Sequence, residues 1–355
     1  MGERRVVYAH NYDMVLARQL VREGSYPGQH LYGMAHAERI GLSVSVVPLA
    51  PWPALRSASR ALGWRLGDVG QELDVLRQGG RRRNVVRYSG EIHGLSGLAM
   101  LRGAHLSGTP LVCVLHQPVP TDRRTSLVLR GIDVAVCLSG VVREQLIRDH
   151  GRDRATTRLA CFGPDLTFPG YDSSRDGGYV ISTGKTGRDL PTLLAALART
   201  RHPARVYSLQ APAAAVPVGT EIVMPRRPED SFAGMGQFPA ARVIDDMRNA
   251  SVVAMPLETD RLLGLTELAD ALALGKPIIA TRSQFLDVDV EAIGCGRVVE
   301  AGDVDGWSAA IAELMGDDDL RRRMGAAARS FAESSCNERL FGEVVVDALR
   351  TAAAV

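Results

Sequence analysis

The amino-acid sequence predicts an α/β protein of two domains, each built on a parallel β-sheet covered by helices. Short apolar runs alternate with segments of helical period along nearly the whole chain, as in parallel sheets joined by crossover helices. The best candidate for a linker is at residues 162–178, where glycine, proline and polar residues follow without a period. The chain of 355 residues also exceeds the ~250–300 residues at which a single core stops growing. We therefore expect domains at 1–165 and 166–335 and a closing segment at 336–355.

The first half contains six predicted strands joined by helical segments. The strands, each a short apolar run, are expected at 6–10, 42–49, 84–88, 111–115, 134–138 and 158–162. The helices are expected at 14–21, 29–40, 95–106, 125–130 and 141–150. Apolar runs of this length between polar turns favour buried strands of a parallel sheet.

Two histidines and a glycine loop mark candidate ligand positions in the first half. His10 and His116 follow predicted strands, at the edge where open α/β sheets bind ligands, although each alone is more often a structural histidine. Gly24 and Gly28 bound a flexible loop between the first two helices. Their spacing to Gly33 is not GxGxxG, so the dinucleotide fingerprint is absent.

The pattern loosens between residues 51 and 83. Trp52 and Trp64 flank arginines, and an arginine cluster follows at 81–83. Such a segment could contact an acceptor or an anionic membrane surface. A solvated helix face is the favoured interpretation, and peripheral membrane contact is the less favoured alternative.

The second half repeats the alternation. Its strands are expected at 179–183, 205–209, 221–224, 252–255, 277–280 and 297–300. Its helices are expected at 191–200, 240–249, 265–274, 304–315, 317–334 and 337–352.

The stretch 251–281 combines a strand, a polar loop, a helix and a second strand. Gly264 precedes the helix, Glu267 and Asp270 lie in its first two turns, and Gly275 ends it. Backbone amides at a helix N-terminus bind anions, and a carboxylate one turn further can reach a ribose hydroxyl. The stretch therefore predicts a nucleotide-sugar site.

A second glycine loop, at 184–189, leads from a predicted strand into a helix. It lacks the GxxxxGK[ST] spacing of a P-loop. Lys185 and Arg188 still place two cations beside the start of a helix, a combination suited to a diphosphate. Lysine is a rare choice here, because only Lys185 and Lys276 among the 42 basic residues are lysines.

The composition bounds the class of protein. The net charge of +2 gives no reason to expect nucleic acid as a partner. No apolar run approaches the ~18 residues of a membrane span, and the N-terminus lacks the apolar stretch of a secretory signal, so we expect a cytoplasmic protein. The cysteines form no CxxC pair and are expected to be buried thiols, with neither zinc nor disulfides. They are Cys113, Cys137, Cys161, Cys295 and Cys336.

Two acidic triplets, 287–289 and 303–305, have the DxD form of some metal sites. Both lie late in the chain near predicted helix starts, where aspartates cap helices or interact with the helix dipole. We therefore expect no bound metal.

Together these stretches resemble the retaining glycosyltransferases of family 4, or glycosyl transferases group 1. That family has a Gly-Arg loop with a following Lys, and later a stretch of the form EGFGL…EAMA.G.PV.AT. Lys185 stands at the family's Arg position and Arg188 at its Lys position. Alignment on Gly275 puts Asp270, rather than Glu267, at the family's second acidic position. Glu258 is the nearest candidate for the first, although eleven residues separate it from Asp270 where the family has seven.

The resemblance implies the GT-B fold, in which two Rossmann-like parallel-sheet domains face a central cleft and the closing helix packs back on the first domain. It implies transfer of a sugar from a nucleotide diphosphate donor, of UDP or GDP type, to an acceptor hydroxyl with retention. No metal or other cofactor is required, since cations and helix amides stabilise the leaving diphosphate. The acceptor is left open among a small molecule, a lipid-linked intermediate and a glycan.

The resemblance also distributes roles among the candidate residues. The diphosphate is expected to contact a set of cations and amides, namely Lys185, Arg188, Gly264, Leu265 and Thr266. Asp270, with Glu267 beside it, is expected to hold the ribose. His116 and Glu258 are expected to be the catalytic residues, placed at the donor sugar, and Gly24 and Gly28 match the family's N-terminal glycine loop.

Three other functions are weighed against this one. A nucleotide-sugar epimerase would share the fold, and a non-catalytic GT-B protein would bind a nucleotide sugar or a partner enzyme. The altered glutamate spacing keeps the non-catalytic alternative open. A nicotinamide oxidoreductase is disfavoured, because GxGxxG follows neither domain's first strand.

Overall fold

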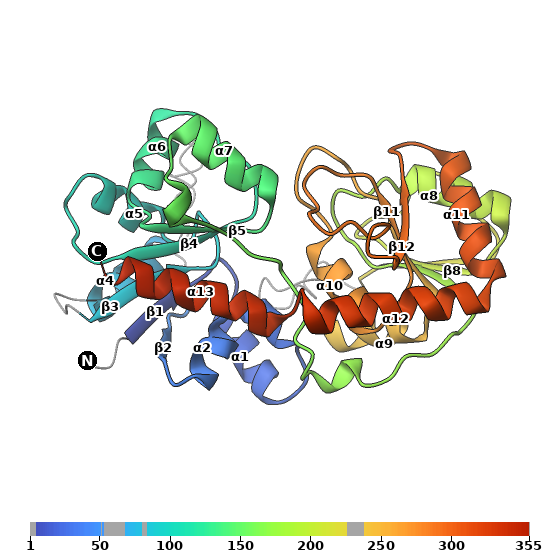
Figure 1. Ribbon diagram of the computed structural model, residues 1–355, viewed down its shortest axis with the longest axis horizontal. Coiled ribbons are helices and arrows are strands. Elements are labelled where there is room, and N and C mark those ends of the chain that lie inside the picture. The colour runs from blue at the N-terminus through green and yellow to red at the C-terminus, as the bar shows by residue number, and fades with distance from the viewer. Residues whose placement is uncertain (1–4, 51, 53–67, 80–83, 226–237, 355) are drawn as a thin grey trace.

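Two six-stranded sheets organise the chain, one in each half (Figure 1). This computed structural model describes residues 5–50, 52, 68–79, 84–225 and 238–354. All strand pairs within the two sheets are parallel. The predicted α/β architecture with two parallel sheets is therefore confirmed.

The first sheet has the order β2-β1-β3-β4-β5-β6 and the second the order β12-β11-β10-β7-β8-β9. The first comprises β1 (Arg5–Ala9), β2 (Ser43–Val46), β3 (Val85–Ser89), β4 (Leu111–Leu115), β5 (Val134–Cys137) and β6 (Thr157–Leu159). The second comprises β7 (Val180–Ser182), β8 (Ala204–Tyr207), β9 (Thr220–Val223), β10 (Val252–Met255), β11 (Ile278–Thr281) and β12 (Gly296–Val299). In each sheet the strand order reverses once, between β1 and β3 and between β7 and β10. Ligands of open α/β sheets bind at such reversals.

Helices cover both faces of each sheet. The first half contains α1 (Met14–Arg22), α2 (Met34–Arg39), α4 (Val69–Gly79), α5 (Ser96–Gly103), α6 (Arg123–Arg130) and α7 (Gly140–His150). The second half contains α8 (Leu190–Thr200), α9 (Ala240–Asn249), α10 (Leu265–Ala273), α11 (Val304–Gly316), α12 (Asp318–Ser334) and α13 (Glu338–Ala352). Three short 3-10 helices, η1 (Gly28–Leu31), η2 (Arg154–Thr156) and η3 (Pro169–Tyr171), lie in connections.

The strands are buried on both faces, as their continuous apolar sequence requires. Along β1, Val6 and Tyr8 pack into one core cluster and Val7 and Ala9 into another. This alternation follows from the two-residue period of a strand. Four such clusters, one on each face of each sheet, make up the core.

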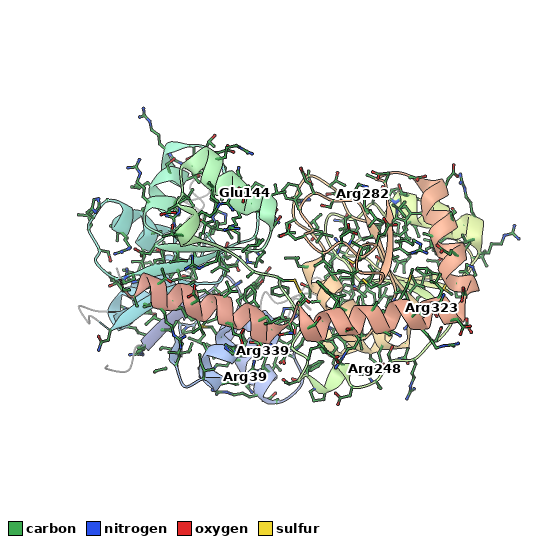
Figure 2. All side chains as sticks on the ribbon, viewed as in Figure 1. Arg39, Glu144, Arg248, Arg282, Arg323 and Arg339 are labelled. Atoms are coloured by element: carbon green, nitrogen blue, oxygen red, sulfur yellow. A yellow bond between two sulfur atoms is a disulfide. The ribbon has the colours of Figure 1, made fainter. Side chains whose placement is uncertain are left out.

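The last two helices run end to end along both halves, α12 beside the second sheet and α13 beside the first (Figure 1). Phe341 and Val345 of α13 belong to a core cluster of the first sheet. Glu338 at the start of α13 accepts a hydrogen bond from the His36 amide at 3.0 Å and pairs with Arg39 of α2. Figure 2 shows Arg39 and Arg339 on these adjoining elements. The end of the chain is thus docked on the first half.

The polypeptide passes between the halves twice, after β6 and between α12 and α13, and these two passages touch. A Cβ on Gly163 would lie 2.3 Å from the Asn337 nitrogen, so only glycine permits this approach. A disulfide joins Cys161 to Cys336 at the same place. The prediction of five free thiols is therefore wrong for this pair, because a contact between residues 175 positions apart cannot be inferred from cysteine spacing.

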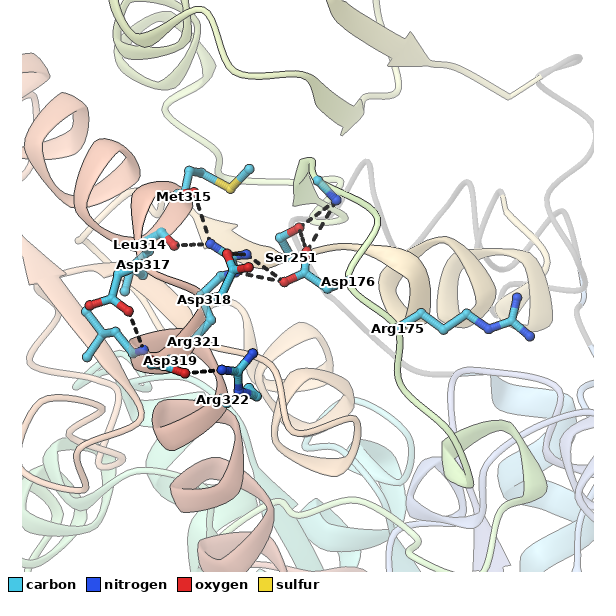
Figure 3. A network of polar contacts seen from close by, with 12 residues as sticks. Arg175, Asp176, Ser251, Leu314, Met315, Asp317, Asp318, Asp319, Arg321 and Arg322 are labelled. Atoms are coloured by element: carbon cyan, nitrogen blue, oxygen red, sulfur yellow. Dashed lines mark hydrogen bonds and ion pairs between the residues drawn. The ribbon is translucent and has the colours of Figure 1, made fainter.

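A polar network anchors the end of the first passage to the second half (Figure 3). Arg321 of α12 donates to Asp176 from Nε at 2.9 Å and from a terminal nitrogen at 2.7 Å. The same guanidinium donates to the Leu314 carbonyl at 2.7 Å, and Asp176 also pairs with Ser251. The connection at 173–178 is therefore held against α12 and β10.

The predicted helix at 29–40 is interrupted. Tyr32 and Gly33 have φ values of 51° and 82°, in the left-handed region that a continuous helix excludes. The Tyr32 carbonyl accepts a hydrogen bond from the Tyr88 hydroxyl at 2.7 Å, and a Cβ on Gly33 would lie 3.1 Å from Val345. Packing against β3 and α13 therefore divides the segment into η1 and α2.

Candidate functional site

The loops that follow β7 and β10 meet where the second sheet reverses its strand order. Arg188 and Leu257 form an isolated antiparallel bridge. The Asp189 amide donates to the Pro256 carbonyl at 2.9 Å, and the Glu258 amide donates to the Gly187 carbonyl at 3.0 Å. The two glycine-containing loops singled out in the sequence are thus joined along their length.

A cavity of about 660 Å³, here called the first cavity, opens beside these loops. The second half contributes residues of 183–188, 238–244 and 263–270 to its wall. The facing wall comes from the first half and is largely aromatic, comprising Tyr12, Met14, Leu20, Ser25, Tyr26, His30 and Tyr32. The first cavity therefore lies between the two halves.

The start of α10 lines the first cavity with backbone amides. Gly264 has φ +81°, and no side chain among the described residues caps the helix. Glycine suits this left-handed conformation, which other residues rarely adopt. The amides of Leu265 and Thr266, both cavity-lining residues, have no intrahelical acceptor at this end. Such a terminus attracts anions.

Lys185 brings a cation to the same cavity. Its Nζ lies 5.5 Å from the centre of the Phe238 ring. Burial lowers the pKa of Lys185, and the nearby Asp270 carboxylate opposes that shift. The described residues provide no salt-bridge partner for Lys185, so its ammonium group is available to an anionic ligand.

Arg188 and Glu267 form a buried ion pair at the cavity edge. Their side chains are 6% and 3% exposed, and Arg188 donates to Glu267 Oε2 at 2.8 Å. Glu267 Oε1 accepts three more hydrogen bonds, from the Thr183 amide at 2.5 Å, the Thr183 hydroxyl at 3.0 Å and the Gly184 amide at 3.1 Å. Glu267 therefore fixes the 183–188 loop to α10, and its hydrogen-bonding capacity is used within the protein.

Asp270, one turn further along α10, differs from Glu267 in its hydrogen bonds and in its pKa. Its Oδ1 accepts from the Tyr171 hydroxyl at 2.5 Å and from Gln29 Nε2 at 3.2 Å. Burial raises the pKa of Asp270 to about 7, and the Glu267 charge adds to the shift, whereas the Tyr171 hydrogen bond and Lys185 oppose it. Asp270 lines the first cavity, and its Oδ2 has no hydrogen-bond partner among the described residues.

A second cavity of about 960 Å³ adjoins the first and shares Tyr12 and Tyr32 with it. It lies at the strand-order reversal of the first sheet, where His10 follows β1 and Glu91 follows β3. His116 also lines it, and its Nε2 lies 2.8 Å from the Gly90 carbonyl oxygen. The second cavity is therefore built from strand ends of the first half.

His10 is fixed as the neutral tautomer that carries a proton on Nε2. Its Nδ1 accepts from the Tyr12 amide at 3.1 Å, and burial with the nearby His116 lowers the pKa of His10 to about 3, against a weaker opposing contact from Asn11. The Nε2 atom is buried without a partner among the described residues. His10 thus offers an unused donor at the cavity wall.

Glu91 presents a complementary acceptor in the second cavity. Its Oε1 is likewise buried without a partner among the described residues. Burial raises the pKa of Glu91 to about 7, while the His93 and Gly94 amides oppose the shift. At neutral pH this carboxyl group therefore lies near its midpoint.

Several predicted site residues do not come together. Glu258 is 49% exposed, pairs with Arg261 at 3.0 Å and lines neither of the two cavities. Gly24 also lines neither. Gly28 donates its amide to Asp165 Oδ2 at 3.0 Å, so it supports the passage between the halves. His116 reaches the second cavity and not the first.

Sequence reasoning did not single out Tyr171, Gln29 or Glu91. Tyr171 lies in the irregular connection between the halves, where an aromatic residue among glycines and aspartates was the available signal. Gln29 was expected within a helix. Glu91 follows a predicted strand as His10 does, and the same sheet-edge argument applies to it.

Neither a metal-binding cluster nor a membrane-spanning helix is present among the described residues. Within those ranges, no group of three or more His, Cys, Asp or Glu side chains lies close enough to hold a metal ion. No helix in the same part of the chain has the length and apolar character of a membrane span. Trp64, residues 81–83 and most of the segment around them lie outside the described residues.

Part of the chain matches a known family in sequence. Residues 229–331 match the model of the family described as Glycosyl transferases group 1. A stretch of 94 residues is 36% identical to D-inositol 3-phosphate glycosyltransferase of Corynebacterium jeikeium and covers 26% of this chain and 22% of that protein. A stretch of 123 residues is 32% identical to GDP-mannose-dependent monoacylated alpha-(1-6)-phosphatidylinositol monomannoside mannosyltransferase of Corynebacterium glutamicum and covers 33% and 32% of the two chains. The chain thus spans about a fifth to a third of these relatives.

The whole chain is similar in fold to solved structures. A glycosyltransferase from Rickettsia africae superimposes with a TM-score of 0.67 at 11% identity, over 99% of both chains. Sucrose-phosphate synthase from Thermosynechococcus elongatus gives 0.67 at 14% identity, also over 99% of both. Anabaena HepE in complex with UDP gives 0.61 at 12% identity, over 98% of this chain and all of that one. These likenesses identify the GT-B fold, and residues 229–331, which match the glycosyl transferases group 1 model, lie within it.

Proposed function

We propose that the chain is a glycosyltransferase that moves a sugar from a nucleotide diphosphate donor to an acceptor hydroxyl, with retention and without a metal. The observation that carries the proposal is the first cavity. It combines an uncapped helix start, the Lys185 ammonium and a carboxylate with a free oxygen at the strand-order reversal of the second sheet. Amides and a cation suit a diphosphate, and the carboxylate suits ribose hydroxyls.

In the proposed reaction the bond between the anomeric carbon and the diphosphate oxygen breaks, and a bond from that carbon to the acceptor oxygen forms. The hydroxyl proton passes to the departing diphosphate. Lys185 and the amides of Leu265 and Thr266 stabilise the charge that develops on the diphosphate. Arg188 acts through its pair with Glu267, which holds the 183–188 loop, and contacts the diphosphate from that position.

The second cavity is proposed to hold the acceptor. His10 and Glu91 offer a donor and an acceptor of hydrogen bonds there, and His116 faces the same space. Polyol and lipid-linked acceptors are both consistent with the names of the matched relatives. The donor base is proposed to be uracil or guanine, because HepE binds UDP and one relative is GDP-mannose-dependent.

For the domain limits and the cellular location we retain what the sequence predicts. We propose domains at 1–165 and 166–335, with 336–355 returning to the first. A cytoplasmic location is proposed alongside them, although the Cys161–Cys336 disulfide is more typical of oxidising compartments.

A non-catalytic nucleotide-sugar-binding protein is the second candidate. It is favoured by the position of Glu258, which lines neither cavity and is paired with Arg261. A product assay separates it from the transferase and from an epimerase on the same fold.

The test begins with calorimetric titration of UDP, GDP and a panel of their sugars, followed by incubation of the bound donor with candidate acceptors in EDTA. We expect release of free nucleoside diphosphate together with a glycosylated product. Binding without turnover would favour the non-catalytic protein, and an altered sugar still attached to the nucleotide would favour the epimerase. Activity that requires added Mg²⁺ or Mn²⁺ would contradict the metal-free proposal.

A further inference from the structure

Two buried side chains from outside α10 and the 183–188 loop reach Asp270. Tyr171 lies in η3, on the passage between the halves, and Gln29 lies in η1 of the first half. They are 3% and 1% exposed. Neither belongs to α10 or to the loop that carries Lys185 and Arg188.

The three side chains form a closed set of hydrogen bonds. Gln29 Nε2 donates to the Tyr171 hydroxyl at 2.9 Å, and both groups donate to Asp270 Oδ1 at 3.2 and 2.5 Å. Because both bonds fall on Oδ1, the carboxylate plane is fixed and Oδ2 is left for another donor. A ribose offers two adjacent hydroxyl donors.

Gln29 is itself held in place. Its Oε1 accepts from the Asp165 amide at 2.8 Å, and Asp165 Oδ2 accepts from the Gly28 amide at 3.0 Å. A Cβ on Gly28 would lie 2.5 Å from Asp165 Oδ2, so glycine is required for this contact. The set therefore links three segments, namely 28–29 in the first half, 165–171 on the passage, and α10.

The neighbouring carboxylate, Glu267, is held by hydrogen bonds from the second half. Glu267 is surrounded by donors of its own half, with hydrogen bonds on both oxygens. Asp270 accepts side-chain hydrogen bonds from Tyr171, which lies on the passage and packs in a core cluster of the second half, and from Gln29 of the first half. Gln29 therefore ties Asp270 to the first half. The orientation of Asp270 is thus coupled to the arrangement of the two halves.

We propose that Tyr171 and Gln29 are positioning residues that hold Asp270 with Oδ2 directed at the ribose of the nucleotide. Recognition of the nucleotide by the second half then depends on contact with the first. The inference rests on the proposed function, since it assumes that a nucleotide occupies the first cavity. Ligand-binding groups held by such supporting hydrogen bonds lose affinity when the support is removed.

The test compares a nucleotide that has ribose hydroxyls with one that lacks them. Calorimetry would measure the dissociation constants of UDP and GDP and of their 2′,3′-dideoxy counterparts for the full chain and for Tyr171→Phe. We expect Tyr171→Phe to weaken binding of the hydroxylated nucleotide about tenfold, from the loss of a hydrogen bond to a charged group. Its affinity for the dideoxy nucleotide should stay within about twofold of that of the parent chain.

A matched control and a second variant complete the design. Tyr179→Phe removes a tyrosine hydroxyl that donates to the Asp246 carbonyl, away from the first cavity, and should change neither affinity. Gln29→Met removes the second donor to Asp270 and should give the same ribose-dependent loss in a smaller degree. It provides an independent measurement should one variant fold poorly.

The outcomes are distinct. Equal weakening of both nucleotides by Tyr171→Phe would show a merely structural role, and unchanged binding of both would show no role; either result overturns the inference. If the parent chain binds neither UDP nor GDP nor their sugars, the proposed function fails and the inference fails with it. Strong binding of UDP or GDP with no ribose-dependent loss leaves the function standing and rejects the positioning role alone.

Discussion

The two cavities that meet at Tyr12 and Tyr32 occupy equivalent places in their sheets and differ in chemistry. Each lies at a strand-order reversal, where the loops of neighbouring strands diverge. In the second half a helix begins there without a cap, beside Lys185 and the Arg188–Glu267 pair. In the first half His10 follows β1 and Glu91 follows β3. His10 is neutral, and the pKa of the Glu91 carboxyl group is raised to about 7.

The difference indicates that the two cavities bind different chemical groups. Fixed cations and amides select an anion, whereas an imidazole N–H and a carboxyl group with an elevated pKa suit hydroxyl groups. The charged residues of the second cavity, Asp122, Arg123 and Arg124, come from the start of α6 and are exposed, so they lie at its rim. The same topology thus provides one site for a diphosphate and another for an acceptor.

The largest effect is expected from the buried ion pair of the first cavity. Arg188→Ala should lower the free energy of unfolding by about 3–5 kcal/mol, because Glu267 would remain buried without its charge partner. Adding Glu267→Gln should recover part of the loss, since the uncompensated charge is then absent. Urea denaturation measures both variants.

Arg261→Ala is the matched control for that variant. Arg261 and Glu258 are each 49% exposed, and removing an exposed partner should change stability by less than about 1 kcal/mol. An Arg188→Ala variant as stable as Arg261→Ala would show that the pair does not hold the 183–188 loop.

A smaller effect is expected from the free cation, and it should appear in binding rather than stability. Lys185→Ala should weaken nucleoside diphosphate affinity about tenfold or more, from the loss of roughly 1.5–3 kcal/mol of charge-assisted hydrogen bonding. Its unfolding midpoint should change little, because the described residues provide no salt bridge for Lys185. Calorimetry with UDP and GDP checks the affinity.

The other lysine supplies the contrast. Lys276 Nζ is buried against the Arg175 and Ala250 carbonyls, so Lys276→Met should destabilise the fold and leave the affinity of the folded protein unchanged. The reverse pattern, with binding lost in Lys276→Met and kept in Lys185→Ala, would remove the diphosphate from the first cavity.

The sheets were predictable because their strands are continuous apolar runs such as 252–255 and 278–281, which have few alternatives to burial. The interruption of 29–40 was not, since it is imposed by contacts of Tyr32 and Gly33 with β3 and α13. The Cys161–Cys336 disulfide depends on the contact between the two passages, which local sequence does not encode.

The candidate site was predictable to the extent that it is local. The start of α10 and the 184–189 loop carry their chemistry within a few residues, and the structure brings them together. Which of the two carboxylates, Glu267 or Asp270, keeps an oxygen free for a ligand was not predictable. Glu267 accepts hydrogen bonds from Thr183, Gly184 and Arg188. Asp270 accepts them from residues about 100 and 240 positions away along the chain. Helix position alone does not distinguish a structural carboxylate from a ligand-binding one.

The smallest effect is expected in the second cavity, from Glu91→Gln. Burial raises the pKa of Glu91 from 4.5 to about 7, so between these values the folded protein binds a proton that the unfolded chain has released. The contribution of Glu91 to stability is therefore present below pH 4.5 and is lost as the pH rises to about 7. Glutamine does not titrate, so its contribution to stability does not change with pH over this range.

Glu91→Gln should consequently match the parent chain near pH 4.5 and exceed its stability at pH 8. We expect a gain of about 1–2 kcal/mol, less than the ~3 kcal/mol that the full shift allows, because the cavity opens to solvent. Urea denaturation across this pH range measures the difference, and UDP or GDP affinity should stay unchanged. A stability difference independent of pH would show that folding does not raise the pKa of Glu91. A loss of nucleotide affinity would show that the two cavities do not bind their ligands separately.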